Sequence, residues 1–251
     1  MTRIIMHGCN GKMGQVITEI VEKDDEAQIV AGIDINPVQK NEYPVFANIN
    51  DCDVQADVVI DFAAPAAIPG LLKYCVENNV PAVLCTTGLT KEHLDMVNEA
   101  SKKVAILKSA NMSLGINTIL KLVHEISPLL AKANFDIEIV EKHHNQKVDA
   151  PSGTALAIAD SINDSLDNEY SYKYDRSGDR VKRPVKEIGI SSVRGGTIVG
   201  EHEIIYAGKD EVIEIKHTAY SKAIFAKGAV TASKFLKGKQ AGMYDMSDVI
   251  G

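Results

Sequence analysis

The sequence predicts an α/β protein with a doubly wound, Rossmann-type nucleotide domain and an α+β substrate domain that carries a mixed β-sheet. Two observations lead to this prediction. Up to about Ser113, short continuous apolar runs alternate with amphipathic segments, the pattern of parallel strands buried between two layers of helices. Beyond that point, apolar and polar residues alternate along longer strands, as in a sheet with one solvated face.

The first part divides into regular strand and helix units. Apolar runs predict strands at 3–7, 28–34, 58–60, 81–84 and 104–107, and the segments between them predict helices at 12–23, 66–78 and 91–101. Right-handed crossovers between such units give a doubly wound sheet. Ligands of these sheets bind beyond the carboxyl ends of the strands, so the loops that follow the strands are candidate binding loops.

The second part follows a different pattern. A helix is expected over 115–130, and period-two alternation predicts strands at 135–141, 187–193, 198–206 and 211–217. A further helix is expected because Ala155, Ile158, Ala159, Ile162 and Leu166 share one face. The polar stretch 167–186 is expected to be a mobile connection. A last helix over 221–237, stopped by Gly238, could return to the first sheet, which the pattern alone does not decide.

Composition excludes several classes of protein. The 251 residues are 45% hydrophobic and 24% charged, as in ordinary soluble domains. No apolar run approaches the ~20 residues of a membrane span, and no signal peptide opens the chain, so a cytoplasmic protein is expected. The net charge of −7 argues against nucleic acid as a partner but allows a local basic pocket for a small anion. Cys9, Cys52, Cys75 and Cys85 lack ligand spacing, so reduced thiols and no metal site are expected.

A glycine-rich turn follows the first predicted strand. Gly8, Gly11 and Gly14 form G-x-x-G-x-x-G at the strand–helix junction, where glycine permits a tight turn and close approach of the backbone to a pyrophosphate. The helix that follows directs its free N–H groups at the phosphates. Asp34 ends the second strand and is placed to bind the adenosine ribose. Together these features favour dinucleotide binding over a merely structural turn.

Asp34 also bears on the choice of cofactor. Its carboxylate would repel a 2′-phosphate, and Ile35 and Asn36 follow it where an arginine would be needed. NADH is therefore expected to be used at least as well as NADPH. Two loops after later strands, 85–88 and 109–112, are candidates to touch the nicotinamide half, although ordinary turns would have similar sequences.

The segment 141–155 contains the candidate catalytic residues. Two histidines and a lysine lie where an alternating strand ends, and Pro-Ser-Gly-Thr then opens a helix. Ser152 is a natural N-cap, which would leave the amides of Gly153 and Thr154 to bind a carboxylate. Lys147 can neutralise a second negative charge, and a histidine can transfer a proton near neutral pH. A solvated histidine pair and a plain helix cap remain alternatives, whereas a metal site is disfavoured because a third ligand is missing.

The motif H-H-x-x-K-x-D-A-P-S-G-T-A in this segment resembles the signature of the dihydrodipicolinate reductase family. The likeness extends to the loops at 86–88, 111–117, 200–202 and 242–246. It implies a dinucleotide-binding domain made of residues 1–112 and 222–251, and a domain of residues 113–221 for substrate binding and oligomerisation into a homotetramer. It also implies reduction of 4-hydroxy-tetrahydrodipicolinate, with loss of water, by NADH or NADPH in diaminopimelate and lysine biosynthesis.

The resemblance assigns roles to residues one by one. His143 becomes the proton donor and Lys147 a second acid or charge stabiliser. The substrate, a small anionic dicarboxylate, would be bound by His144, Ser152, Gly153 and Thr154. Cofactor contacts would come from Gly8, Cys9, Asn10, Gly11, Lys12, Met13, Asp34, Cys85, Thr86, Thr87, Ser109, Ala110, Asn111 and Met112. Two departures stand out: Cys85 replaces the usual glycine, and Ile35 stands where some members have arginine.

Two other functions would need only part of this set of residues. A different NAD(P)-dependent dehydrogenase of amino or keto acids would share the glycine turn but would not need the H-H-x-x-K…S-G-T cluster. A non-catalytic NAD(H)-binding sensor would keep Gly8, Gly11 and Asp34 but would not need His143 or Lys147. The presence of both sets of residues in one chain favours the reductase.

Overall fold

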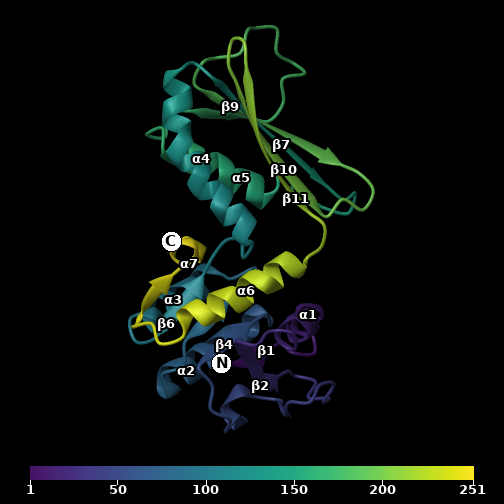
Figure 1. Ribbon diagram of the computed structural model, residues 1–251, viewed down its shortest axis with the longest axis vertical. Helices are drawn as coiled ribbons and strands as arrows, with labels where there is room; N and C mark the ends of the chain where they lie inside the picture. The colour runs from purple at the N-terminus through teal and green to yellow at the C-terminus, as the bar shows by residue number, and fades with distance from the viewer. The chain divides into compact units, whose positions relative to one another are not determined.

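The computed structural model describes residues 1–251, which divide into two compact units (Figure 1). The first unit is Met1–Ser113 with Ala223–Gly251, and the second unit is Leu114–Lys222. One unit contains a parallel sheet and the other a mixed sheet, which confirms the predicted fold class. No helix is both long enough and apolar enough to cross a membrane.

The first unit is built on a seven-stranded sheet whose paired strands are all parallel. Its strand order is β12-β6-β5-β4-β1-β2-β3, which reverses direction between β1 and β4 and so creates the switch point at which doubly wound sheets bind ligands. The strands are β1 (Thr2–His7), β2 (Ala27–Ile33), β3 (Val45–Phe46), β4 (Val58–Asp61), β5 (Ala82–Leu84), β6 (Ala105–Lys108) and β12 (Gly242–Tyr244).

Helices cover this sheet in two groups. Helices α1 (Lys12–Val21) and α6 (Ala223–Leu236) contact each other, and α6 runs across β4, β5 and β6 (Figure 1). Helices α2 (Ile68–Asn78) and α3 (Lys91–Ser101) form the other group. Because the chain moves in opposite directions from the switch point, right-handed crossovers put the two groups on opposite faces. The chain closes with the short helix α7 (Met246–Ile250).

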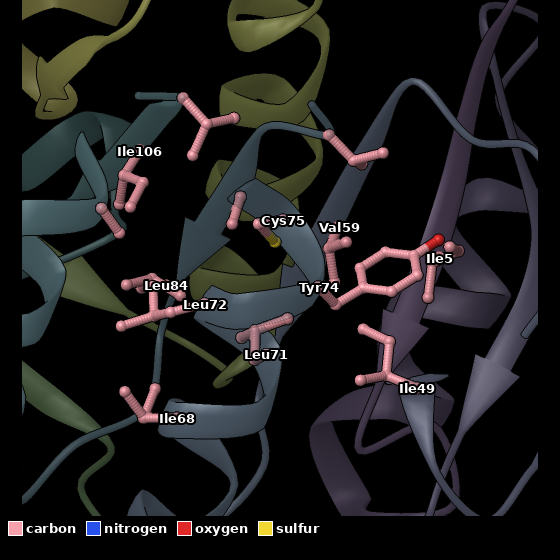
Figure 2. Close-up of a cluster of buried hydrophobic side chains, with 14 of the residues drawn as sticks. Ile5, Ile49, Val59, Ile68, Leu71, Leu72, Tyr74, Cys75, Leu84 and Ile106 are labelled. Carbon is pink, nitrogen blue, oxygen red and sulfur yellow. The ribbon is translucent and has the colours of Figure 1, made fainter. Parts of the chain in front are cut away.

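The core of this unit shows why α2 forms and where it packs. Its apolar residues are spaced three and four apart, so they share one face of the helix, and they are buried. Figure 2 shows them converging on side chains from the sheet. The helix contributes Ile68, Leu71, Leu72 and Cys75, and the strands contribute Ile5, Val59, Leu84 and Ile106. Burial of this kind stabilises the unit by about 1.5–3 kcal/mol for each large side chain.

The second unit has a five-stranded mixed sheet in the order β11-β10-β7-β9-β8. Strands β7, β9 and β8 run parallel, whereas β10 is antiparallel to both β7 and β11. The elements are α4 (Leu114–Lys132), β7 (Asp136–His143), α5 (Gly153–Asp164), β8 (Ser171–Lys173), β9 (Glu187–Arg194), β10 (Gly200–Ala207) and β11 (Val212–Ala219). Helices α4 and α5 pack side by side along one face of the sheet (Figure 1).

The prediction of a mobile connection over 167–186 was wrong in part. Residues 171–173 form β8, which pairs in parallel with β9. Arg176 and Arg183 also form ion pairs with Glu138 of β7, and Arg176 reaches Glu187 of β9. A strand of three residues is too short to show a period, and ion pairs between distant segments leave no local pattern. For the same reason β3, β12 and α7 were not predicted.

Candidate active site

The glycine turn lies between β1 and α1 and adopts a backbone that side chains would disrupt. Gly8 has φ of +82°, and a Cβ added there would lie 2.8 Å from the carbonyl oxygen of Phe62. A Cβ added at Gly14 would overlap the carbonyl oxygens of Gly8 and Cys9. Gly11 is the N-cap of α1, and no side chain caps the helix. The helix start therefore presents backbone N–H groups suited to a phosphate.

Asp34 is tied to this turn. Its carboxylate accepts hydrogen bonds from the backbone amides of Asn10, at 3.0 Å, and Asn36, at 3.0 Å. The side-chain amide of Asn10 donates to two backbone carbonyls, but its Oδ1 is buried without a partner. Ile35 is 96% exposed beside Asp34. The structure thus brings the turn and Asp34 together, and Oδ1 of Asn10 is a buried acceptor without a partner between them. This arrangement fits the ribose and phosphates of a dinucleotide.

The side chains of Cys9, Lys12 and Met13, which also belong to the turn, differ in their burial. The Cys9 side chain is fully buried against Gly32 and Tyr43, so only its backbone faces the turn. Burial raises the pKa of the Cys9 thiol to about 11, with a further contribution from the Asp34 carboxylate. Lys12 is exposed and Met13 is half-buried at the start of α1. Cys9 can therefore contact a cofactor through its backbone alone.

A buried hydrogen-bond network anchors the loop after β5. Asp61 is fully buried at the end of β4, where its Oδ1 lies 2.8 Å from Nδ1 of His7 at the end of β1. The Thr86 hydroxyl donates to Asp61 Oδ2 at 2.5 Å. Thr86 thus holds the loop in place, whereas Thr87 is exposed. Sequence reasoning missed His7 and Asp61, although both are polar residues that end apolar strands at the switch point.

The remaining candidate cofactor-binding residues of the first unit lie in the loops that follow β5 and β6. Burial raises the pKa of the Cys85 thiol well above its ordinary value, and the nearby Asp61 adds to this shift. Met112 lies in the loop after β6 and is buried, and a Cβ added at Gly228 of α6 would overlap its carbonyl oxygen. The close packing of α6 fixes the loop 109–112. Ser109 and Asn111 are half-buried in it and Ala110 is exposed.

In the second unit, the buried face of β7 changes from apolar to polar at its last two inward positions. Ile137 and Ile139 are followed by Glu141, which is fully buried, and by His143. Nδ1 of His143 lies 2.5 Å from Oε2 of Glu141. Arg194, which pairs with His143 in the sheet register, binds both carboxylate oxygens of Glu141 at 2.8 and 2.7 Å.

The Glu141 carboxyl remains ionised despite its burial. Burial by itself would raise its pKa. Hydrogen bonds from the side chains of Arg194, His143 and Ser192 and from the Ser152 amide outweigh this effect and lower the pKa to about 2. A carboxylate is therefore present beside His143 throughout the neutral pH range. A bidentate arginine–carboxylate pair of this kind also fixes the geometry of the group.

The other ring nitrogen of His143, Nε2, faces the backbone of β10. Gly200 precedes Glu201, which pairs with Lys142 at this end of β7, and a Cβ added at Gly200 would lie 3.0 Å from Nε2 of His143. The ring of His202 packs edge-on against His143 with centroids 5.2 Å apart. With Nδ1 occupied by Glu141, Nε2 is the nitrogen that can exchange a proton with a ligand.

Ser152 was predicted as the N-cap of α5, and the structure confirms this. Its Oγ accepts from the amide of Ala155 at 3.1 Å and lies 3.0 Å from Nε2 of His202. Burial and the neighbouring His143 lower the pKa of His202 to about 4, so His202 is neutral near pH 7 and accepts the hydroxyl proton. Since Ser152 is 2% exposed and both bonds are internal, its side chain positions the helix start and does not face a ligand.

The start of α5 lies beside another carboxylate of the chain, that of Asp149. This carboxylate accepts a hydrogen bond from Nζ of Lys147 at 2.8 Å, which is the main cause of the lowered pKa of its carboxyl, and the Gly153 amide makes a smaller contribution. The lysine ammonium thus already holds a carboxylate beside the helix start. Nearby, His144 is half-buried and its Nδ1 has no partner. No group of three or more metal-binding side chains is formed.

Comparisons with family models cover almost the entire chain. Residues 2–112 match the model described as "Dihydrodipicolinate reductase, N-terminus". Residues 115–250 match the model described as "Dihydrodipicolinate reductase, C-terminus". The two matches meet near the end of the first predicted domain segment.

Similar proteins carry consistent names. The 4-hydroxy-tetrahydrodipicolinate reductase of Clostridium tetani is 53% identical over 98% of this chain and 96% of that protein. The reductase of the same name from Clostridium novyi is 52% identical over 100% and 98%. Among solved structures, the dipicolinate-bound dihydrodipicolinate reductase from Paenisporosarcina sp. TG-14 has a TM-score of 0.80 at 26% identity, covering 98% of this chain and 97% of that chain.

Proposed function

The chain belongs to the dihydrodipicolinate reductase family, and from this premise we propose that it reduces 4-hydroxy-tetrahydrodipicolinate to tetrahydrodipicolinate, with loss of water, in diaminopimelate and lysine biosynthesis. It is an oxidoreductase that uses a nicotinamide cofactor. The single observation that carries the proposal is the segment 141–154, in which His143 is paired with the Glu141 carboxylate and Lys147 binds the Asp149 carboxylate beside the start of α5.

The first unit holds NADH or NADPH in this proposal. Backbone amides of the turn at residues 8–13 bind the pyrophosphate, Asp34 binds the adenosine ribose, and the loops 85–87 and 109–112 lie beside the nicotinamide. When bound, the cofactor supplies a hydride. NADH is used at least as well as NADPH, because the Asp34 carboxylate repels a 2′-phosphate and exposed Ile35 offers it no positive charge.

The second unit holds the dicarboxylate. Lys147 and the start of α5, through the Gly153 and Thr154 backbone, bind one carboxylate in place of Asp149, and His144 contributes to the other. The Paenisporosarcina structure contains dipicolinate, a ring with two carboxylates, which supports a ligand of this class. Fixing both carboxylates orients the ring for reaction, and orientation can supply up to ~7–11 kcal/mol in ideal cases.

The chemical steps follow from this placement. The substrate loses its ring hydroxyl with a neighbouring proton as water, which gives a conjugated imine. The conjugated imine accepts hydride at the ring carbon distal to nitrogen, and the electron pair moves through the ring to nitrogen to give the anion of an enamine. Protonated His143 then delivers its Nε2 proton to the ring carbon next to the imine carbon, which restores the imine. Lys147 stabilises the negative charge of the bound carboxylate and can serve as a second acid.

A coupled spectrophotometric assay tests the proposal. NADH oxidation is followed with the product that the aldolase forms from pyruvate and aspartate semialdehyde. His143→Gln and Lys147→Ala are expected to lower kcat by about 10²-fold or more with little change in cofactor affinity. A wild-type protein that binds NADH but does not oxidise it would favour the sensor alternative. Near-normal turnover in both variants would refute the residue roles.

We also propose a cytoplasmic homotetramer. The four cysteines are free thiols, which fits a reducing compartment. Val193, Val212 and Ile213 are exposed apolar residues on strands of the second unit, and such positions are common in interfaces. Light scattering on the purified protein is expected to give four times the chain mass of 27.2 kDa. A mass of one chain at micromolar concentration would contradict the tetramer.

A further inference from the structure

We propose that Glu141, held by Arg194, is a positioning residue that fixes His143 as the proton donor and joins it to the start of the helix that binds the substrate carboxylate. This inference rests on the proposed function and assigns a role to two residues outside the sequence motif. It is carried by the contacts of one fully buried carboxylate, Glu141, with a side chain or backbone amide from each of three segments: β7, β9 and the start of α5.

Stability alone does not explain a carboxylate at this position. The preceding inward residues of β7, Ile137 and Ile139, are apolar and fully buried. Replacing a buried ion pair by apolar residues of similar size is often neutral or stabilising, because taking two charges out of water costs several kcal/mol each. An apolar side chain at 141 would continue the core. The ion pair of Glu141 with Arg194 therefore serves an additional purpose.

The first consequence of the carboxylate concerns the His143 ring. An ionised carboxylate is an acceptor only, so the short contact of Oε2 with Nδ1, at 2.5 Å, requires a proton on Nδ1. The ring is thereby held in one orientation with Nε2 directed away from Glu141.

The second consequence concerns the helix start. Oε1 of Glu141 accepts from the Ser152 amide at 3.0 Å, and the Ser152 hydroxyl caps α5. The amide that follows Ser152 is that of Gly153, one of the groups that bind the substrate carboxylate in the proposed function. A single rigid group therefore sets the distance between the proton donor and the anion-binding helix start. A change that moves Glu141 would displace both.

The groups around His143 leave one tautomer of its ring. Glu141 faces it from β7 and Arg194 from β9, His202 faces it from β10 in the neutral form, and Lys147 lies on the loop that follows β7. Arg194 keeps Glu141 ionised, so the proton shared within the pair stays on the imidazole. Without the Glu141 charge, Nδ1 loses its fixed acceptor and the proton of the neutral ring can reside on either nitrogen.

The test compares Glu141→Gln with Glu138→Gln. Glu138 lies on the same strand and is also paired with arginines, Arg176 and Arg183, but no contact links it to His143. In Glu141→Gln, kcat is expected to fall about 10–100-fold. Dissociation constants for NADH stay within about twofold. Glu138→Gln keeps the wild-type kcat.

Nitrogen NMR of the His143 ring provides a readout that does not need turnover. In the wild type the spectrum is expected to show a proton on Nδ1 over the neutral range, and in Glu141→Gln a mixture of tautomers. Glu141→Asp, which restores the charge, is expected to recover part of kcat and the proton on Nδ1. An unchanged tautomer in a folded Glu141→Gln protein would overturn the inference, whatever its kcat. Wild-type protein that fails to reduce the substrate would overturn the proposed function, while the tautomer would still decide the role of Glu141.

Discussion

Substituting Arg194 by methionine removes the cation from a buried carboxylate while keeping a side chain of similar length. Arg194 donates two hydrogen bonds to Glu141, at 2.8 and 2.7 Å, and one to the Asp149 carbonyl, at 2.6 Å. Glu141 has no exposed side-chain surface, so water does not replace the lost partner. Breaking a buried pair from one side costs about 3–5 kcal/mol, and we expect the free energy of unfolding to fall by that amount near neutral pH.

The pKa of Glu141 gives an independent estimate of the same magnitude. It is lowered from 4.5 to about 2 in the folded protein. The ionised carboxylate thus contributes on the order of 3 kcal/mol to stability. Because the folded pKa is the lower one, this contribution is present above pH 4.5 and is lost as the pH falls towards 2. In Arg194→Met the carboxyl pKa rises, so the variant and the wild type differ most at neutral pH and converge in acid.

Urea unfolding at two pH values measures this difference. Circular dichroism is followed near pH 7 and again near pH 4, with an unchanged m-value as the check that the same surface unfolds. Lys216→Met is the matched control, since Lys216 pairs with Glu201 at 2.9 Å but is 45% exposed, and such surface pairs contribute about 0–1 kcal/mol. A loss below about 1 kcal/mol for Arg194→Met at pH 7, or an equal loss at both pH values, would refute the reasoning.

Two other substitutions test the proposed geometry in each unit. Gly200→Ala would place a methyl group 3.0 Å from Nε2 of His143, and steady-state assays should show kcat reduced by about tenfold with the dissociation constant of NADH unchanged; a normal kcat would show that Nε2 is not the proton-donating nitrogen. Ile35→Arg would put a cation beside Asp34, and kcat/KM for NADPH should rise by about tenfold relative to NADH. If the ratio of kcat/KM for NADPH to that for NADH did not change, the 2′-hydroxyl of the adenosine ribose would not lie beside residue 35.

Much of the fold followed from local patterns. Continuous apolar runs predicted β1, β2, β4, β5 and β6, and period-two alternation predicted β7, β9, β10 and β11, each within a few residues. The elements that were missed contain two to five residues and depend on neighbours that are distant in sequence. Residues 242–244, for example, form β12 because they align with residues 105–107 of β6.

The candidate site was predictable where its residues are consecutive. The segment with His143, Lys147 and Ser152 was identified from the sequence, but Arg194 was not, because it reaches Glu141 only through the parallel register of β7 and β9. The alternation of β7 did place Glu141 on the buried face, and a buried carboxylate requires a cation. The alternation therefore predicts a cationic partner for Glu141, but it does not identify Arg194 as that partner.

Hydrogen bonds within one loop are a further limit of sequence reasoning. The motif predicted that the amide of Gly153 would be free for a ligand. Asp149 lies in the same loop, and its carboxylate lies beside this amide and binds the Lys147 ammonium. Residue types alone do not show whether a carboxylate of the chain or of a ligand will occupy such a site, because the chemistry is the same.

Isotope transfer measures the central claim most directly. The reaction is run with nicotinamide cofactor that carries deuterium on the transferred position, in ordinary water, and the product is analysed by mass spectrometry and NMR. The account predicts one deuterium on the ring carbon distal to nitrogen and a solvent-derived proton on the carbon next to the imine carbon. Loss of the deuterium to solvent, or its appearance on any other carbon, would contradict direct hydride transfer to the bound dicarboxylate.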